Sequence, residues 1–202
     1  MMTLESTHEE VLAEMERLRV LYALKQTLRY MSKRPDEHSE SVAEHLFAMQ
    51  VLALYFLPLE DPQGKLDRAR INELILFHEL GEIETGDIPF HKKNREHVAE
   101  EQRAAVRVSQ RLPESMQQLA LERSQEFEER KTPEALFAVA IDKLEPVFEM
   151  YEERVLPLFK RQQITRSFAV NVKREATKNF PYMRKFLDAW EARAVSLDIF
   201  PE

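Results

Sequence analysis

Glycine scarcity limits what this chain can fold into, because only 3 of its 202 residues are glycine. Turn-dense β-sandwiches and glycine-rich phosphate loops both need glycine at several positions, so the composition argues against either. The abundant residue types are the good helix formers Ala, Leu, Glu, Lys, Arg and Gln. We therefore expect an all-α fold.

Apolar residues recur at helical spacings of three, four and seven along most of the chain, and no alternating strand pattern or internal repeat is visible. These patterns predict about eight to ten helices in one domain, 1–202. A loop is expected over 58–65, and Asp67 is the expected N-cap of the helix that follows it. The expected helices are 4–31 (one or two helices), one that opens at 39 or 40, 68–80, 96–111, 113–130, 133–154, 168–178 and 182–195.

Charge and cysteine content exclude several classes of protein. The net charge of −7 argues against binding of nucleic-acid polymers, although a local basic pocket for one phosphate remains compatible with it. There is no cysteine, so disulfides and thiolate metal sites are excluded, and we expect a cytoplasmic protein. No signal peptide is visible, and no uncharged apolar run approaches the roughly 18–20 residues of a membrane span, so no membrane partner is expected.

Residues 77–89, FHELGEIETGDIP, carry the densest group of chemically active side chains: His78, Glu79, Glu82, Glu84 and Asp87. The apolar segment 71–77 leads directly into this group, so it is expected at an interior or a cleft, where such side chains need partners. Adjacent His and Glu ligands converge on one ion only at a helix end or beside a cleft, and this pair suits Zn, Mn, Fe, Co or Ni and, more weakly, Mg. The alternative is a partly buried His beside an exposed Glu.

Two further candidates lie on apolar helices. His45 shares a helical face with Val42 and Met49, so it is either a ligand or a core histidine with an ordinary partner. Asp142 follows residues 137–141, of which four are aliphatic, and needs a partner if buried; a salt bridge to Lys143 is the simpler explanation. Pro146 should distort the helix at Asp142, because its ring crowds the carbonyl four residues back.

Other charged side chains are candidates for acid–base chemistry or for phosphate binding. Glu82 and Asp87 return near the His-Glu pair if Gly86 turns the chain, and carboxylates there can act as general acid and base. The alternative is a solvated acidic loop. Arg29 and Lys93 are candidate phosphate ligands, although each, taken alone, also fits an ordinary surface charge.

Together, Ser41-Val-Ala-Glu-His45, His78-Glu79-Leu-Gly-Glu82 with Thr85-Gly-Asp87-Ile-Pro, and Asp142-Lys-Leu-Glu145 resemble the motifs of the HD-domain metal-dependent phosphohydrolases. The similarity is greatest to the branch with the bacterial 5′-deoxynucleotidases and the small HD domain-containing protein 2-like hydrolases. It covers about residues 25–155, and Glu126–Ala135 also looks like the run that precedes the last ligand of that family. The implied fold is a single HD-domain helical bundle, on which the C-terminal helices, 166–196, pack.

The resemblance also implies a function and a set of site residues. One divalent metal ion would be held by His45, His78, Glu79 and Asp142, and its identity among Mn, Co, Mg, Fe, Ni and Zn is open. Glu82 and Asp87 would position or activate the attacking water, and Arg29 and Lys93 would contact the substrate phosphate. The expected activity is hydrolysis of nucleoside 5′-monophosphates or similar small phosphomonoesters by a homodimeric enzyme.

Glu79 departs from the family pattern, which has Asp at this place, and this departure leaves a second hypothesis open. Glutamate has the same charge and donor atoms on a side chain one methylene longer. If that length moves the carboxylate away from the ion, the chain is a catalytically weakened HD-fold module that binds a nucleotide or metal for regulation. A displacement on the order of 1 Å costs about 10²-fold in rate.

Overall fold

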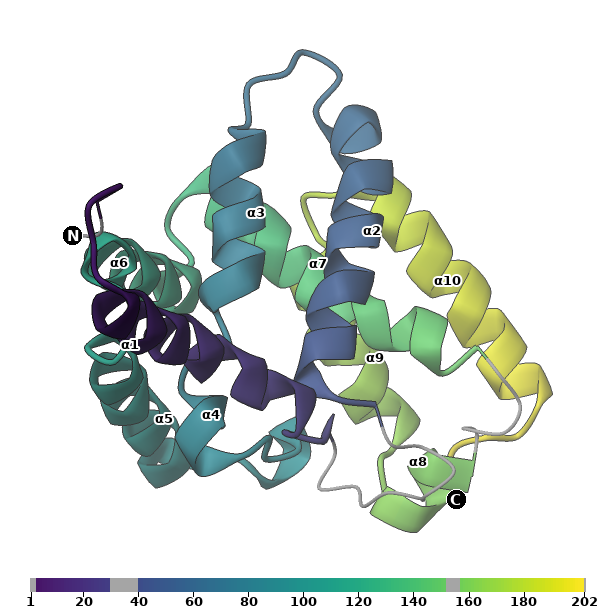
Figure 1. The fold of residues 1–202 in the computed structure, drawn as a ribbon. Coiled ribbons are helices and arrows are strands. Elements are labelled where there is room, and N and C mark those ends of the chain that lie inside the picture. Colours follow the sequence, from purple (N-terminus) through teal and green to yellow (C-terminus); the bar gives the residue numbers. More distant parts are fainter. Residues whose placement is uncertain (1–2, 30–39, 152–156, 202) are drawn as a thin grey trace. The chain divides into compact units, whose positions relative to one another are not determined.

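A computed structural model describes residues 3–29, 40–151 and 157–201, and these residues are all-α, as expected (Figure 1). Within them there is no β-strand; one isolated antiparallel bridge joins Leu28 and Ser41. The helices, in chain order, are α1 (His8–Arg19), η1 (Val20–Lys25), α2 (Val42–Glu60), α3 (Arg68–Phe77), α4 (Glu82–Thr85), η3 (Phe90–Lys92), α5 (Arg95–Ser109), α6 (Glu114–Glu129), α7 (Pro133–Glu149), α8 (Pro157–Gln162), α9 (Arg166–Ala176) and α10 (Pro181–Ser196).

The chain separates into two compact units. Unit 1 comprises Met1–Leu46 and Glu73–Glu129, and unit 2 comprises Phe47–Asn72 and Arg130–Glu202. The prediction of a single domain, 1–202, stays a prediction. Each unit has its own packed helices.

Unit 1 is built on the contacts of α5 with α4 and α6, and Figure 1 shows α5 and α6 side by side. Its core consists of buried apolar side chains from the end of α3, the following turn, α5, and α6 with the residues just before it. The buried members of this core are Phe77, Leu80, Ala105, Val108, Leu112 and Ala120. Burial of such side chains contributes about 1.5–3 kcal/mol for each large one, so this core fixes the turn that follows α3.

Gly81 shows how closely that turn approaches α5. A Cβ atom at this position would lie 2.4 Å from the backbone carbonyl oxygen of Glu101 and 3.0 Å from its carbonyl carbon. No side chain fits at that distance from a backbone atom, so glycine is required here for close packing and not for an unusual backbone angle.

Unit 2 is built on α7, α9 and α10, with the residues of α2 from Phe47 onwards. Phe56 and Phe186 meet edge to face with ring centroids 5.0 Å apart, and Phe159 lies 5.9 Å from Trp190. Polar contacts fix the C-terminal helices: the Met183 N–H at the start of α10 donates to Glu60 Oε1 at 2.8 Å. Glu191 is buried and accepts hydrogen bonds from arginines 166 and 174 of α9.

Local capping signals confirm several helix starts. Asp67 accepts hydrogen bonds from the N–H groups of Ala69 and Arg70, at 2.9 and 3.2 Å, and so caps α3 as predicted. Thr132 caps α7 by accepting from Ala135 N–H at 3.2 Å, with Pro133 in the first turn. α7 then continues through Pro146 to Glu149.

Several predicted boundaries were wrong. The α-helix expected within 4–31 runs only from His8 to Arg19 and passes into η1, and residues 30 and 31 lie outside the described part. The loop expected from residue 58 starts at 61, because Pro58 does not end α2, which continues to Glu60. The helix expected over 68–80 ends at Phe77, where i→i+3 backbone bonds replace the α-helical ones. Two short helices, α4 and α8, were not predicted.

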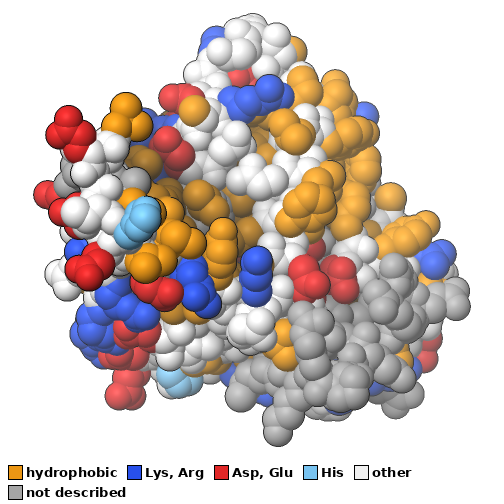
Figure 2. All heavy atoms as spheres, in the orientation of Figure 1, with side chains coloured by type: hydrophobic (Ala, Val, Ile, Leu, Met, Phe, Trp, Pro, Cys, Tyr) orange, Lys and Arg blue, Asp and Glu red, His pale blue; other side chains and the backbone are white. Residues whose placement is uncertain are grey.

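The outward face of α2 in unit 2 is apolar. Phe47 is 71% exposed, and Val51, Leu54 and Tyr55 follow it at helical spacing, each about half exposed. Figure 2 shows hydrophobic side chains gathered over α2 and α10. In the part of the chain that the structure describes, α2 is the one helix long and apolar enough to cross a membrane, a criterion that core helices of soluble proteins also meet.

Candidate metal centre

The turn after α3 places two neighbouring residues at a helix end. α3 ends at Phe77, and His78 to Gly81 form a tight turn closed by Leu80 N–H to Phe77 O at 3.3 Å and Glu82 N–H to Glu79 O at 3.1 Å. Side chains of adjacent residues in a continuous helix point about 100° apart. Ending the helix here lets His78 and Glu79 approach each other, which meets the condition set by the sequence.

The imidazole of His78 is held in one orientation. It is 8% exposed, its ring lies 4.3 Å from that of Phe127 at a tilt of 30°, and its Nδ1 lies 2.9 Å from the carbonyl oxygen of Ile75. A carbonyl oxygen only accepts, so Nδ1 carries the proton in this contact. The neutral ring then presents the lone pair of Nε2, and a backbone bond of this kind commonly orients metal-binding histidines.

His78 Nε2 is buried and has no hydrogen-bond partner among the described residues. Its nearest polar neighbour is Glu79 Oε1, at 3.3 Å. With Nδ1 as the donor, Nε2 and Oε1 are two acceptors that face each other, an arrangement that is stable only with a proton or a cation between them. A buried polar atom without a partner calls for an explanation, and a bound ion is one that also accounts for the facing carboxylate.

His45 completes this group in unit 1. It is fully buried near the start of α2, and its ring centroid lies 6.0 Å from that of His78. One ligand atom each of His45, His78 and Glu79 lies within 4.8 Å of the others. Atoms about 2.0–2.2 Å from one ion are at most about 4.4 Å apart, so small adjustments bring all three donors onto one cation. The additional methylene of Glu79 therefore does not remove its carboxylate from the histidines.

Next to these ligands lies a pocket of about 50 Å³ in unit 1, lined by His78, Glu79, Glu82, Lys93 and Glu101 among others. Lys93 Nζ lies 3.0 Å from Glu101 Oε2 and 3.6 Å from Glu82 Oε1. Three carboxylates thus surround a single ammonium group. Excess negative charge away from water is costly unless a cation compensates it.

The pKa of Glu82 is raised well above 4.5, first by burial and then by the charges of Glu79 and Asp87. Lys93 and Arg29 oppose this shift without cancelling it. Burial alone would lower the pKa of Lys93, but the carboxylates of the pocket raise it above 10.5, so the ammonium group stays charged. The pKa of Glu101 is raised, chiefly by burial.

Arg29 and Asp87 lie at the edges of this group. Arg29 is buried, and its Nε lies 3.5 Å from Glu40 Oε2. The backbone secures the pair, since Arg29 N–H donates to Glu40 O at 2.8 Å. Asp87 is half-buried after Gly86, whose φ of 72° makes the turn expected there. The charge of Asp87 raises the pKa of Glu82. Glu82 is only 3% exposed, so the interpretation of this segment as a solvated acidic loop was wrong for Glu82.

Asp142 belongs to unit 2. It is 5% exposed on α7, and its Oδ2 forms an ion pair with Lys143 Nζ at 2.7 Å. The simpler explanation offered by the sequence, a Lys143 salt bridge, is thus present. Its role as a ligand stays a prediction.

Sequence reasoning missed Glu101, Ser124 and Glu128, which line the pocket. For Glu101 a signal existed: it lies on α5 at helical spacing from Val98, Ala105 and Val108, so it is a charged residue on an apolar stripe, as His45 is. The other two lie on the mixed surface of α6 and give no such signal.

The chain is similar to several known proteins. The chain is 30% identical over 126 residues to the 5′-deoxynucleotidase HDDC2 of Dictyostelium discoideum, with 60% of this chain and 66% of that protein covered. It is 31% identical over 127 residues to the 5′-deoxynucleotidase hdd1 of Schizosaccharomyces pombe, with 57% and 59% covered. The chain thus spans roughly three fifths to two thirds of the length of these relatives.

A solved structure from Magnetospirillum magnetotacticum, described as a "predicted metal-dependent phosphohydrolase", superposes with a TM-score of 0.73 at 25% identity, with 95% of this chain and 98% of that chain covered. An HD-domain phosphohydrolase from Listeria innocua shares the fold, with a TM-score of 0.60 at 18% identity and coverage of 92% and 88%. The family model for the HD domain matches residues 21–184. The chain belongs to the HD-domain family.

Proposed function

We propose that this protein is a divalent-metal-dependent phosphohydrolase that acts on nucleoside 5′-monophosphates. The observation that carries the proposal is the unpartnered, buried Nε2 of His78, which faces Glu79 beside a pocket with excess carboxylate. The names of the curated relatives, 5′-deoxynucleotidases, support a nucleotide substrate.

In this proposal His45, His78 and Glu79 hold the ion, and Asp142 is the fourth ligand. Support for Asp142 comes from its burial on an apolar helix and from the position that the family resemblance assigns to it. In addition to the proposed ion, the Asp142 carboxylate has Lys143 as a partner. A bound divalent cation would neutralise phosphate charge and make water more acidic.

The other site residues bind the substrate phosphate or transfer protons. Lys93 stays charged and contacts the phosphate, together with Arg29. Glu82 has a raised pKa, so its carboxyl group exchanges a proton closer to neutral pH than an ordinary glutamate, as a general acid or base requires. Asp87 strengthens that shift through its charge and orients the attacking water.

Purified protein prepared without chelator tests the proposal. Elemental analysis should find a divalent metal, and phosphate release from AMP, dAMP and CMP should follow addition of Mn, Co, Mg or Zn. Glu84→Gln is the matched control, because Glu84 lies on α4 two residues after Glu82 but pairs with Arg107 at 2.8 Å on the surface. Bound metal without phosphate release from any nucleotide would contradict the proposal.

Glu79→Asp separates the enzyme from the weakened binding module. Since the Glu79 carboxylate already reaches both histidines, we expect the shorter side chain to leave activity unchanged or to lower it. A large gain of activity from an inactive parent would instead support the weakened module.

We also propose that the protein forms a homodimer, as the resemblance implies, and that the exposed face of α2 (Phe47, Val51, Leu54, Tyr55) is the surface to test. Light scattering with size-exclusion chromatography should give twice the mass of the 23.9 kDa chain. Phe47→Glu should give the monomer mass. A monomeric parent, or a variant that stays dimeric, would exclude this surface.

A further inference from the structure

A second and larger hollow lies in unit 1 beside the pocket of about 50 Å³ that His78, Glu79 and Lys93 line. It is a groove of about 640 Å³ between α5 and α6, lined by ten residues. This volume is in the range of small-molecule sites, about 300–1,000 Å³. The lining residues are Ala99, Gln102, Arg103, Ala105, Val106, Leu121, Ser124, Gln125, Glu128 and Glu129. We call this hollow the α5–α6 groove.

The groove and the pocket of about 50 Å³ share four lining residues: Gln102, Ala105, Ser124 and Glu128. They are therefore neighbouring compartments on the same two helices. The smaller one has room for an ion and a few atoms but not for a nucleoside. A substrate whose reacting phosphate lies near Lys93 must place its remaining atoms elsewhere, and the groove is the adjoining space in unit 1.

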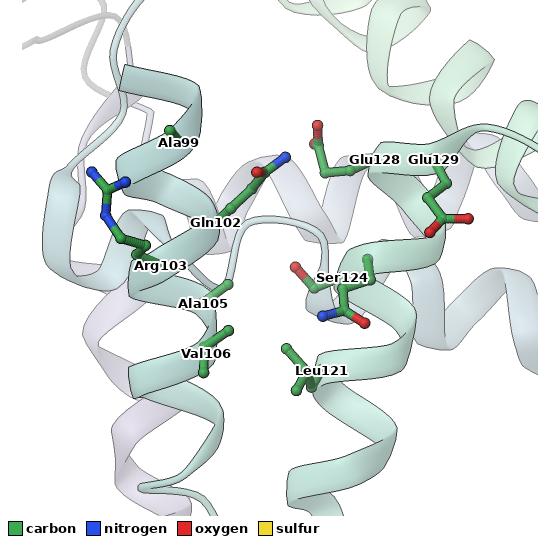
Figure 3. A pocket seen from close by; sticks show the side chains of 10 residues that line it. Ala99, Gln102, Arg103, Ala105, Val106, Leu121, Ser124, Glu128 and Glu129 are labelled. Atoms are coloured by element: carbon green, nitrogen blue, oxygen red, sulfur yellow. The ribbon is translucent and has the colours of Figure 1, made fainter. Parts of the chain in front are cut away.

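The lining of the groove favours an uncharged group. Ala105, Val106 and Leu121 provide an apolar surface, and Figure 3 shows Val106 and Leu121 facing each other from the two helices. Arg103 points away from α6 in Figure 3 and pairs with Glu100 at 2.7 Å. The remaining charges of the lining, Glu128 and Glu129, are negative, so a second phosphate is disfavoured in the groove.

Two amides provide the polar contacts. Gln102 extends from α5 toward α6 (Figure 3), and Gln125 lines the groove from α6. Both side chains are exposed, and neither has a hydrogen-bond partner in the part of the chain that the structure describes. Each amide offers two N–H donors and a carbonyl acceptor, the combination that the edges of nucleobases match.

We infer that the α5–α6 groove binds the nucleobase of the substrate, with Gln102 and Gln125 as the residues that contact its edge and set specificity for nucleotides over simpler phosphate esters. This inference rests on the proposed function for the position of the phosphate. It assigns the two ends of the substrate to two compartments: the anionic end to Lys93, and the neutral end to the amides and the apolar surface.

The first experiment measures binding without catalysis. Metal-free protein is titrated with adenosine, cytidine and ribose 5-phosphate, and the side-chain amide signals of Gln102 and Gln125 are followed by ¹⁵N NMR. The nucleosides should shift both signals in a saturable way, and ribose 5-phosphate should not. The side-chain amide signal of Gln118 is the control, because Gln118 is exposed on α6, bonds Glu122 and does not line the groove.

The second experiment measures kcat/KM for AMP and for ribose 5-phosphate in the metal-loaded enzyme. Val106→Trp, which fills the groove, should lower the value for AMP on the order of tenfold and change the value for ribose 5-phosphate less than twofold. Gln102→Leu should act in the same direction, and Gln118→Leu should change neither. Thermal melting shows whether each variant is folded.

The outcomes separate this inference from the proposed function. Saturable nucleoside binding that leaves both amide signals unmoved would overturn the inference, as would equal losses for AMP and ribose 5-phosphate in Val106→Trp. No nucleoside binding at all would overturn it as well. If no phosphate ester is hydrolysed but nucleosides shift the two amides, the groove assignment holds and the proposed function fails.

Discussion

Two groups of charged side chains lie between α4 and α5 in unit 1, and they are built in opposite ways. The surface group contains Glu84, Glu100, Arg103, Arg107 and Arg111, so each of its acids has at least two arginine partners. Arg107 contacts both carboxylates at 2.8 Å, and Arg111 contacts Glu84 at 3.3 Å. Its charges are neutralised within the group.

The buried group contains Glu79, Glu82, Lys93 and Glu101, with three acids for one base. Oxygen atoms of Glu82 and Glu101 have no hydrogen-bond partner among the described residues. The chain thus neutralises charge where water is available and keeps a surplus of negative charge where it is not. This surplus of negative charge costs free energy of folding. Such a surplus is expected at a site that binds a cation.

Removal of one buried acid should have the largest effect. Glu82→Gln should lower the proposed activity roughly 10²–10⁴-fold, as expected for loss of a general acid or base. The control Glu84→Gln should retain activity within about threefold. Phosphate release from AMP measures both, and equal losses in the two variants would remove the distinction between the groups.

The same Glu82→Gln change should stabilise the metal-free protein. The pKa of Glu82 is raised in the fold, so the folded state resists ionisation, and stability falls as pH rises above 4.5 toward the raised value. The advantage of Gln should therefore be absent at acidic pH and grow toward neutral pH. Urea unfolding with EDTA at several pH values measures it, and an advantage independent of pH would contradict this account.

Lys93→Met removes the only base of the buried group. The three carboxylates lose the cation that they share, and we expect a loss of about 3 kcal/mol in the free energy of unfolding of metal-free protein at pH 7. The loss should shrink at pH 5, because the carboxyl groups can then protonate. The raised pKa of Lys93 keeps its own contribution present throughout the neutral range. Equal destabilisation at both pH values would show that packing and not charge is responsible.

Gly81→Ala tests the contact that holds the buried group together. The new Cβ would meet the Glu101 carbonyl at 2.4 Å, so α5 must move, with a loss of about 1–3 kcal/mol. Gly64→Ala is the comparison, because φ is +64° there but nothing lies within 4 Å, so only backbone strain of about 1 kcal/mol applies. Metal affinity should fall for Gly81→Ala alone. Similar metal affinities in the two variants would mean that the helix spacing does not matter to the site.

Arg107→Gln should have the smallest effect. The Arg107 ion pairs are exposed to solvent and screened by salt, so the midpoint of thermal unfolding should barely change and activity should be retained. A marked fall in the midpoint of thermal unfolding at high ionic strength would show that the surface group contributes more than screened ion pairs.

Much of the fold follows from local chemistry that the sequence displays. The Asp67 and Thr132 caps and the apolar spacings placed α3, α5, α6 and α7 to within a few residues, apart from the two ends at Phe77 and Glu149. The early end of α3 could not be foreseen, because Phe77 and Leu80 are fixed by packing against α5. Tertiary contacts decided that turn, and local propensity did not.

The proximity of three candidate ligands was predictable from the sequence, whereas the residues around them were predicted only in part. His45, His78 and Glu79 come together as expected, because each is a polar residue within or directly after an apolar helix. The role of Glu101 was missed, since a glutamate within a charged helix has no local mark other than its position on an apolar stripe. The α5–α6 groove was not foreseen, because it depends on the spacing of two helices and not on any motif.

Gly81 also has a consequence for the choice of ion. With no side chain between the turn and the backbone of α5, the segment that carries His78 and Glu79 packs directly on the backbone of Glu101. A coordination shell that cannot contract or expand discriminates ions by radius, whereas a flexible one accepts many. In the proposed metal site, the choice of ion should therefore depend partly on a residue that has no ligand atoms.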